Sequence, residues 1–336
     1  MAAFRLRGSK SHQRHEVGSR CLVACTGKSL LVLYGGQYSG PGSSTRGCYL
    51  VYDAAAPLLS TVPPPPQSWD LISIGVGPLV LRRQPPSSSG SGYLLAELVT
   101  RPSRDLPDAE LYLWRSDGEP TPQWVKKEVR LPRKVCPEAG KHNFSADISF
   151  SGPGTEDTLC WVDLLHGILV CTSPTHDPSF CFIPLPHDCP AVPMTDSSPC
   201  RPHMDELRSV ACVGGAIKLA AMVGVLEGWS LDQFRLSTWT LSPDLREWRL
   251  DGSFHIKDLW ATDEYRALNA PLRVPICPIL SLGEGEDAVF YAVVNDLELR
   301  SILQGPILVR TDADFKCQLS LLHKDRAGLL EVKRPD

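Results

Sequence analysis

One pattern constrains the fold of this chain more than any other: a strand, a short polar turn and a second strand recur at nearly constant spacing. Each copy is a run of β-branched, aromatic and leucine residues, then a turn rich in Asp, Ser, Pro or Gly, then another such run. The copies begin near Tyr49, Leu111, Leu169, Ser237 and Ile307, in steps of 62, 58, 68 and 70 residues. This spacing predicts the same antiparallel hairpin repeated five times.

A second pair of apolar runs precedes each hairpin, which makes four strands per repeat. Repeats of this kind, slightly longer than the usual length of about 40 to 50 residues, are typical of propeller blades with extended loops. A β-sandwich could use the same hairpins, but it would not need them at constant spacing. The sequence therefore predicts an all-β fold, a β-propeller of about five or six four-stranded antiparallel blades. The upstream pairs are CLVACTGKSLLVLY, SIGVGPLVLRR with GYLLAELVT, ADISFSGPGTEDTLCWVD, RSVACVGGAIKLAAMV and CPILSLGEGEDAVFYAVV.

The extent of the repeats predicts one large domain between two short tails. With 336 residues, of which 43% are hydrophobic and 21% charged, the chain can bury a sizeable core. We expect a flexible basic leader over residues 1–18, the propeller over 19–325 and a C-terminal tail over 326–336. The leader carries a single acidic residue, Glu16, so import into an organelle is a minor alternative to a cytoplasmic or nuclear location.

Charge and cysteine content exclude several classes of partner and cross-link. A formal net charge of −4 and a pI near 6.1 provide no basic field for phosphate backbones, so nucleic acid is not expected as a partner. No apolar run reaches the roughly 18 residues that span a bilayer, so no membrane is expected either. The 12 cysteines lie mostly within apolar runs, as buried free thiols do, and no disulfide framework is predicted.

The segment LCWVDLLHGILVC, residues 159–171, holds an aspartate and a histidine that could be mistaken for a catalytic pair. The pattern instead predicts a strand, the turn LLHG and a second strand. Gly167 suits a positive φ in that turn. We therefore expect Asp163 and His166 to stabilise the turn or to face solvent. Four tryptophans on or beside the strands are expected to pack in the core or between blades, with stacking on a ligand as the alternative: Trp114, Trp161, Trp239 and Trp248.

No cofactor is predicted. The segment Gly27–Ser29 matches only the tail of a phosphate-binding loop, because Leu22 stands where that motif needs its first glycine and a strand follows. A Pro-rich stretch gathers ligand-type side chains, but their spacings match no standard zinc site, so no metal is expected. Those side chains are Cys181, His187, Cys189, Cys200 and His203.

Several ordered motifs give the chain a family resemblance. FSADISFSG, LCWVDLLHGILVC, WTLSPDLREWRLD and IKDLWATDEYRALNAPLRVPICPILSL together resemble the plant family called domain of unknown function 1618, from about residue 48 onward. The resemblance implies a plant protein without assigned biochemistry and without catalytic residues to carry over. The hairpins are also distantly similar to Kelch and F-box-associated propellers, which are protein-binding platforms; this likeness is an analogy.

Strand direction in an antiparallel blade places the loops between strands two and three, and those from strand four to the next blade, at one end. The long loops of this chain all fall at that end, where recognition is usually carried. We therefore predict a non-enzymatic protein-interaction module whose oligomeric state is open. The alternative is a hydrolase acting on a glycan at the channel mouth with carboxylates such as Asp258, Asp263 and Glu264. The binding residues predicted on the long-loop face are Trp69, Arg133, Lys134, Lys141, Asp258, Trp260, Asp263 and Tyr265.

Overall fold

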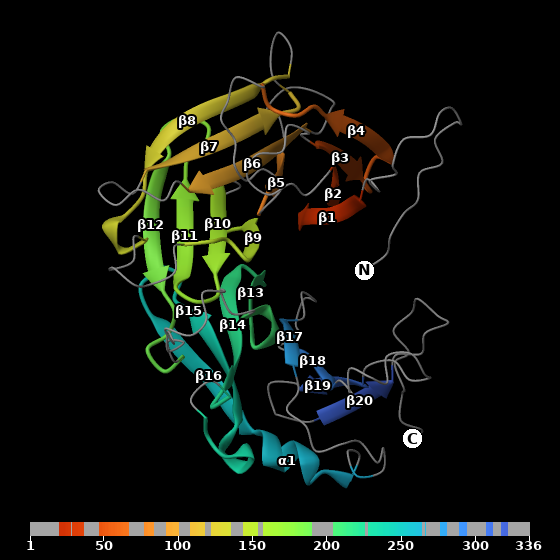
Figure 1. Cartoon of the computed structure of the whole chain (residues 1–336), viewed down its shortest axis with the longest axis vertical. Helices are drawn as coiled ribbons and strands as arrows, with labels where there is room; N and C mark the ends of the chain where they lie inside the picture. The colour runs from red at the N-terminus through yellow and green to blue at the C-terminus, as the bar shows by residue number, and fades with distance from the viewer. Residues whose placement is uncertain are drawn as a thin grey trace, which may run out of the picture. The chain divides into compact units, whose positions relative to one another are not determined.

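The computed structural model divides the chain into two compact units (Figure 1). Unit 1 comprises residues 1–163 and 168–182, and unit 2 comprises residues 164–167 and 183–336. The predicted leader and C-terminal tail lie outside the described residues. The structure describes residues 20–27, 29–36, 47–66, 77–83, 92–100, 108–117, 122–135, 144–153, 157–189, 204–225, 228–263, 266, 276–280, 289–293, 307–311 and 317–321.

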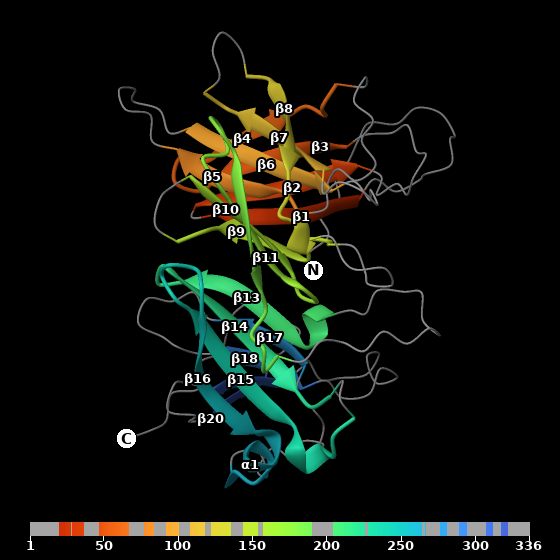
Figure 2. The ribbon, with the colours of Figure 1, turned by 90° about the vertical axis from the view of Figure 1, so that its left-hand side faces the viewer.

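The described residues form five four-stranded sheets, and in each sheet the strands lie side by side in chain order (Figures 1 and 2). Every pair whose register is known is antiparallel. The all-β class and the four-stranded repeat are therefore confirmed. The strands are β1 (Arg20–Gly27), β2 (Leu30–Gly36), β3 (Cys48–Asp53), β4 (Leu58–Val62); β5 (Leu79–Arg83), β6 (Gly92–Thr100), β7 (Asp108–Arg115), β8 (Trp124–Arg130); β9 (Ile148–Ser151), β10 (Thr158–Asp163), β11 (Gly167–Thr172), β12 (Ser179–Pro184); β13 (Arg208–Val213), β14 (Ala216–Val223), β15 (Arg235–Leu241), β16 (Trp248–His255); β17 (Ile276–Leu280), β18 (Val289–Val293), β19 (Ile307–Thr311) and β20 (Cys317–Leu321).

Each predicted hairpin is the third and fourth strand of one sheet, and each upstream pair is the first and second. Helices are short in the described part of the chain: the α-helix α1 (Ile256–Trp260) and the 3-10 helices Arg133–Val135, Met204–Glu206 and Leu231–Gln233. Each repeat predicted from the apolar pattern therefore forms one hydrogen-bonded sheet.

Sheet β5–β8 buries both of its faces inside unit 1. Alternate residues of a strand point to opposite faces, so Leu95 of β6 packs in a cluster with Tyr49 and Val51 of β3. The neighbouring Leu94 points the other way and packs in a cluster with Trp161 of β10. Strand β6 is accordingly buried at nearly every position, as expected for a strand that is enclosed on two sides.

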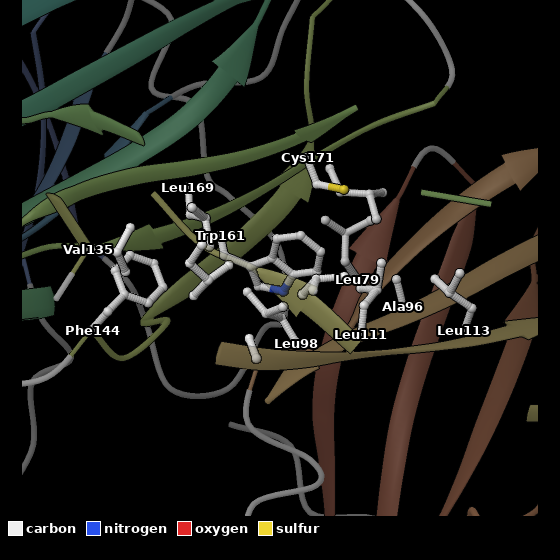
Figure 3. Close-up of a cluster of buried hydrophobic side chains, with 14 of the residues drawn as sticks. Leu79, Ala96, Leu98, Leu111, Leu113, Val135, Phe144, Trp161, Leu169 and Cys171 are labelled. Carbon is white, nitrogen blue, oxygen red and sulfur yellow. The ribbon is translucent and has the colours of Figure 1, made fainter. Parts of the chain in front are cut away.

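Trp161 lies at the centre of the second of these clusters (Figure 3). Its side chain is 0% exposed, and its indole Nε1 donates a hydrogen bond to the carbonyl oxygen of Gly77 at 3.0 Å. Its ring also stacks on Phe180, with ring centroids 6.5 Å apart. The core position predicted from the sequence is confirmed for this residue.

The other three tryptophans also take one of the two predicted positions. Trp114 and Trp239 are buried. Trp248, at the start of β16, is half-buried, and its Nε1 donates to the carbonyl oxygen of Pro184, the last residue of β12, at 2.8 Å. Trp248 thus contacts a strand of another four-stranded sheet, the second of the two expected positions.

An ion pair joins the turn ends of the first two sheets. The guanidinium of Arg82, near the end of β5, donates to the carboxylate of Asp53 at the end of β3 and to Ser29 Oγ at 2.6 Å. Asp53 also accepts hydrogen bonds from the backbone N–H groups of Ala55 at 2.9 Å and Ala56 at 3.4 Å. The hydrogen bond from Arg82, followed by these backbone bonds, lowers the pKa of Asp53 below its ordinary value of 3.8.

Unit 2 has its own apolar core. Sheet β13–β16 contributes Ala220, Met222 and Leu236, and Leu280 of β17 packs against them. Strand β17 contacts both β13 and β14. Ile256, the first residue of α1, belongs to the same core and is 2% exposed.

Trp161→Ala is expected to lower the free energy of unfolding by about 3 to 5 kcal/mol, because it removes a large aromatic ring and leaves a cavity. Urea denaturation followed by circular dichroism measures this loss. Leu250→Ala, at a side chain that is 48% exposed, is the control and should change stability by no more than about 0.5 kcal/mol. Equal unfolding curves for the two variants would contradict the buried position of Trp161.

Asp53→Asn is expected to destabilise the protein at neutral pH and to matter less in acid. A carboxyl whose folded-state pKa is lowered contributes stability above its ordinary pKa, and this contribution is lost as the pH falls through the folded-state value. Denaturation measured from about pH 7 to about pH 2 should therefore show the two curves converging. Combined with Arg82→Gln, the effects should be less than additive; full additivity would show that the ion pair contributes nothing.

Candidate functional site

Two segments of unit 2 come together at one end of sheet β13–β16. The first is the connection between β14 and β15, and the second is α1, which follows β16 directly (Figure 1). The backbone N–H of Ile256 donates to the carbonyl oxygen of Phe234 at 2.9 Å, and the 3-10 helix Leu231–Gln233 contacts α1. We call this region, residues 228–235 and 255–263, the α1 surface.

A glycine allows the connection after β14 to turn tightly. Gly224 has a φ of +102°, which favours glycine, and a Cβ at this position would lie 2.7 Å from Cε3 of Trp229. The indole of Trp229 therefore packs directly over the backbone of the turn. The following 3-10 helix is held by Gln233, whose Oε1 accepts from Ser230 N at 3.2 Å and from Ser230 Oγ at 2.8 Å.

The α1 surface combines an aromatic ring with charges of both signs. The guanidinium carbon of Arg235 lies 5.1 Å from the ring centre of Trp229, a cation–π contact. His255 lies opposite Arg235 in the β15–β16 register, and its Nδ1 is buried without a hydrogen-bond partner among the described residues. Lys257, the second residue of α1, is exposed. Asp232 is exposed beside them, and the hydrogen bond from Ser230, together with the charges of Lys257 and His255, lowers its pKa.

The structure describes three of the predicted binding residues on the α1 surface. Asp258 and Asp263 are exposed. The Asp263 carboxylate lies 3.9 Å from the Arg266 guanidinium. Trp260 is half-buried because part of its ring packs against the apolar core of unit 2.

The other predicted binding residues lie elsewhere in the chain. Arg133 is exposed in unit 1, at the start of the 3-10 helix Arg133–Val135. Lys134 is the middle residue of that helix. Trp69, Lys141 and Tyr265 lie outside the described residues.

Four residues of the α1 surface were missed from the sequence: Trp229, Arg235, His255 and Lys257. A tryptophan that follows a glycine in a connection, with an arginine at the first position of the next strand, was the available signal. Its meaning depends on the turn at Gly224, which brings ring and guanidinium together.

The turn between β10 and β11 is structural, as predicted, but Asp163 does not face solvent. Its side chain is 0% exposed and accepts a hydrogen bond from the backbone N–H of Ser145 at 2.9 Å. The turn itself is held by Arg208, whose Nη1 donates to the carbonyl oxygen of Leu164 at 2.8 Å. Gly167 has the expected positive φ, 154°. The solvent-facing interpretation of Asp163 was wrong because β10 is buried along its whole length.

Two further buried carboxylates belong to the interior of unit 1. Glu110 of β7 accepts a hydrogen bond from the Tyr112 hydroxyl and from Lys126 Nζ, the latter at 3.1 Å. Glu97 of β6 is 0% exposed and lies opposite Tyr112 in the register. Burial raises the pKa of Tyr49 well above its usual value, and the charge of Glu97 raises it further. Both carboxylates therefore lie in the packed interior of unit 1 and not at an exposed site.

The Cys- and His-rich stretch is dispersed in its described part. His187 is exposed and lies 3.8 Å from Asp188, Cys181 is exposed, and Cys189 is buried. Cys200 and His203 lie outside the described residues. Among the residues that the structure does describe, no three His, Cys, Asp or Glu side chains form a group that could hold a metal ion.

The fold and the α1 surface together describe an all-β protein built of repeated four-stranded antiparallel sheets. A surface with aromatic and charged side chains lies at one end of one of these sheets. In the described part of the chain, no helix has the length and apolar character needed to cross a membrane. Residues 161–291 match the family model described as a protein of unknown function (DUF1618). The match supports the resemblance seen in the sequence, and it includes sheet β13–β16 and α1.

Comparison with known proteins adds distant structural likenesses. No curated protein matches the chain in sequence. A Bombyx mori GH32 β-fructofuranosidase mutant in complex with sucrose is 10% identical with a TM-score of 0.36, covering 91% of this chain and 62% of that chain. A Trypanosoma rangeli sialidase mutant displaying trans-sialidase activity is 10% identical with a TM-score of 0.39, covering 90% of this chain and 47% of that chain. The chain thus spans about three fifths and about half of these proteins.

Burial predicts which thiols react with alkylating reagents. It raises the pKa of Cys25 and of Cys171 to about 12, so neither forms the reactive thiolate near neutral pH. Brief treatment of the native protein with iodoacetamide, followed by peptide mapping, should label the exposed Cys181 and spare these two. Labelling in denaturant is the control, in which all three should react. Equal labelling of Cys171 and Cys181 in the native protein would contradict the described packing.

Proposed function

We propose that the protein is a non-enzymatic interaction module, a β-propeller that binds a protein partner at the end of its blades that carries the long loops. The α1 surface carries this proposal, because a half-buried tryptophan and several charges of both signs meet there on a folded support. Protein interfaces favour anchored aromatic and arginine side chains surrounded by polar groups. A polyanion would instead select a surface of one sign.

Two features of unit 1 support the propeller. Sheet β5–β8 packs face to face with a sheet on either side, as blades do. The first sheet buries one face against β5–β8, but its other face is apolar and incompletely covered. Tyr52 is 38% exposed and Leu59, opposite it in the register, is 58% exposed. Such a face is expected to be covered by a further sheet in a closed ring.

Leu31, Leu33 and Leu50 belong to the same face. Leu31 lies opposite Tyr52, and Leu33 lies opposite Leu50, so their side chains share the side that carries Leu59. All three are only partly buried, and this face holds no charged residue in the described part of β2, β3 and β4. Ring closure would bury these side chains without desolvating a charge.

A glycan hydrolase that uses carboxylates at a channel mouth is the alternative from another class. Among the described carboxylates, Glu97, Glu110 and Asp163 are buried inside unit 1, whereas Asp258 and Asp263 are exposed on or just after a five-residue helix. No described feature isolates a pair of them in a concave site, as glycosidases require. Protein binding is therefore the function that we propose.

Charge reversal on the α1 surface tests the proposal. Asp258→Lys combined with Asp263→Lys should weaken binding of the main partner at least tenfold and leave the melting temperature unchanged, because both side chains are exposed. The partner is identified by quantitative affinity purification with the full chain and the affinity is then measured by calorimetry. Asp244→Lys, an exposed residue in the turn between β15 and β16 at the opposite end of the sheet, is the matched control.

Opposite results would reject this assignment. If Asp244→Lys weakens partner binding while the double variant on the α1 surface binds normally, the partner uses the short-turn end. If no partner is enriched over a control protein but the chain hydrolyses a glycan, the enzymatic alternative is favoured. Trp229→Ala, read together with its melting curve, adds a second probe of the α1 surface.

A further inference from the structure

A tract of four prolines, Pro63–Pro66, follows β4 directly in unit 1. Proline fixes its own φ near −65°, and a residue that precedes proline is restricted to extended conformations. Three of these four residues precede another proline, so local sterics restrict them to extended conformations, and proline's fixed φ matches that of the polyproline II helix. The tract belongs to no helix or strand of the structure.

The burial of the tract follows the threefold symmetry of that helix. A polyproline II helix has three residues per turn, so residues three apart lie on the same edge, about 9 Å from one another. Pro63 and Pro66 are both exposed and form one edge, and Pro64 is exposed on a second edge. Pro65, on the third edge, is buried. The tract thus lies on the protein along one edge and presents the other two.

The tract is anchored to a rigid part of unit 1. Val62, the residue before it, is 0% exposed within the cluster between the first two sheets. The carbonyl oxygen of Pro63 accepts a hydrogen bond at 2.8 Å from Nε1 of Trp124, whose ring is itself buried. Because backbone and anchor are already ordered, the tract would lose little conformational entropy when a partner binds.

The charge around the tract restricts the chemistry of its partner. From Ala54 to Trp69 the sequence contains no charged residue. The neighbouring sequence therefore offers a partner apolar stacking and contacts along the backbone, but no ion pair. Aromatic-lined grooves that read two edges of a proline helix supply this combination.

We propose that Pro63, Pro64 and Pro66 are a preformed docking ligand for a proline-recognition module of the WW, SH3 or EVH1 kind. The chain acts here as the ligand, whereas on the α1 surface it acts as the receptor. The two sites lie in different units, and this proposal does not depend on the function of the α1 surface.

The test uses the full chain and three purified probes: a WW domain, an SH3 domain and an EVH1 domain, each labelled with nitrogen-15. Titration with unlabelled protein should shift the aromatic-groove resonances of at least one probe. Pro63→Ala combined with Pro66→Ala should weaken that binding at least tenfold. Pro57→Ala, an exposed proline in the turn between β3 and β4, is the matched control and should bind as the parent does.

Two further measurements distinguish loss of the ligand from loss of the fold. The melting temperature of the double variant should stay near that of the parent, because both prolines are exposed. A synthetic peptide STVPPPPQSW should compete with the chain, and its counterpart with alanine at the same two positions should not. The charge-reversed α1 variant should bind the probe normally, which separates this site from the proposed partner surface.

The proposal is overturned if none of the three probes responds at a protein concentration of about 1 mM, which corresponds to the weakest binding of interest. It is also overturned if the double variant and the parent bind a probe equally well. Competition by both peptides alike would have the same meaning, because binding would then not depend on the exposed edge.

Discussion

The two-sided burial of sheet β5–β8 is the constraint on which the rest of unit 1 depends. A strand buried on one face can alternate apolar and polar residues, but Leu94 and Leu95 are consecutive and both almost fully buried. Their side chains must enter two different clusters, so a sheet has to pack on each side. Face-to-face stacking is thus required by the side chains themselves, and it is the arrangement that a propeller repeats.

Polar groups within this packing set the register of the sheets. Glu110 is satisfied by Lys126 and Tyr112, and Asp53 by Arg82 and its own turn. A slip of one residue would move every apolar side chain to the wrong face and leave these charges without partners. The buried carboxylates are accordingly features of specificity in the fold, which is why an Asp or Glu in a strand of this chain is poor evidence for catalysis.

The two proposed binding surfaces depend on different physical effects. The α1 surface assembles residues that are more than twenty positions apart, and its aromatic and charged groups meet only because a glycine turn and a short helix adjoin. The proline tract needs no such assembly, since each proline restricts the backbone of its neighbour. In the proline tract, the tertiary structure decides only which edge is buried.

The strands, their order within each repeat and the all-β class could be predicted from sequence, because the twofold alternation of apolar residues and the turn residues act over a few positions. The buried place of Trp161 followed from the same pattern. The environment of Asp163 could not be assigned in this way. Asp163 ends a strand that is buried on both sides, and which strand is enclosed is decided by the packing of sheets, over distances that local periodicity does not report. The contact of Trp229 with Arg235 and the covered edge at Pro65 have the same origin: the sequence by itself determined which segments are extended and where they turn, and only the tertiary structure decided which of their side chains meet and which remain exposed.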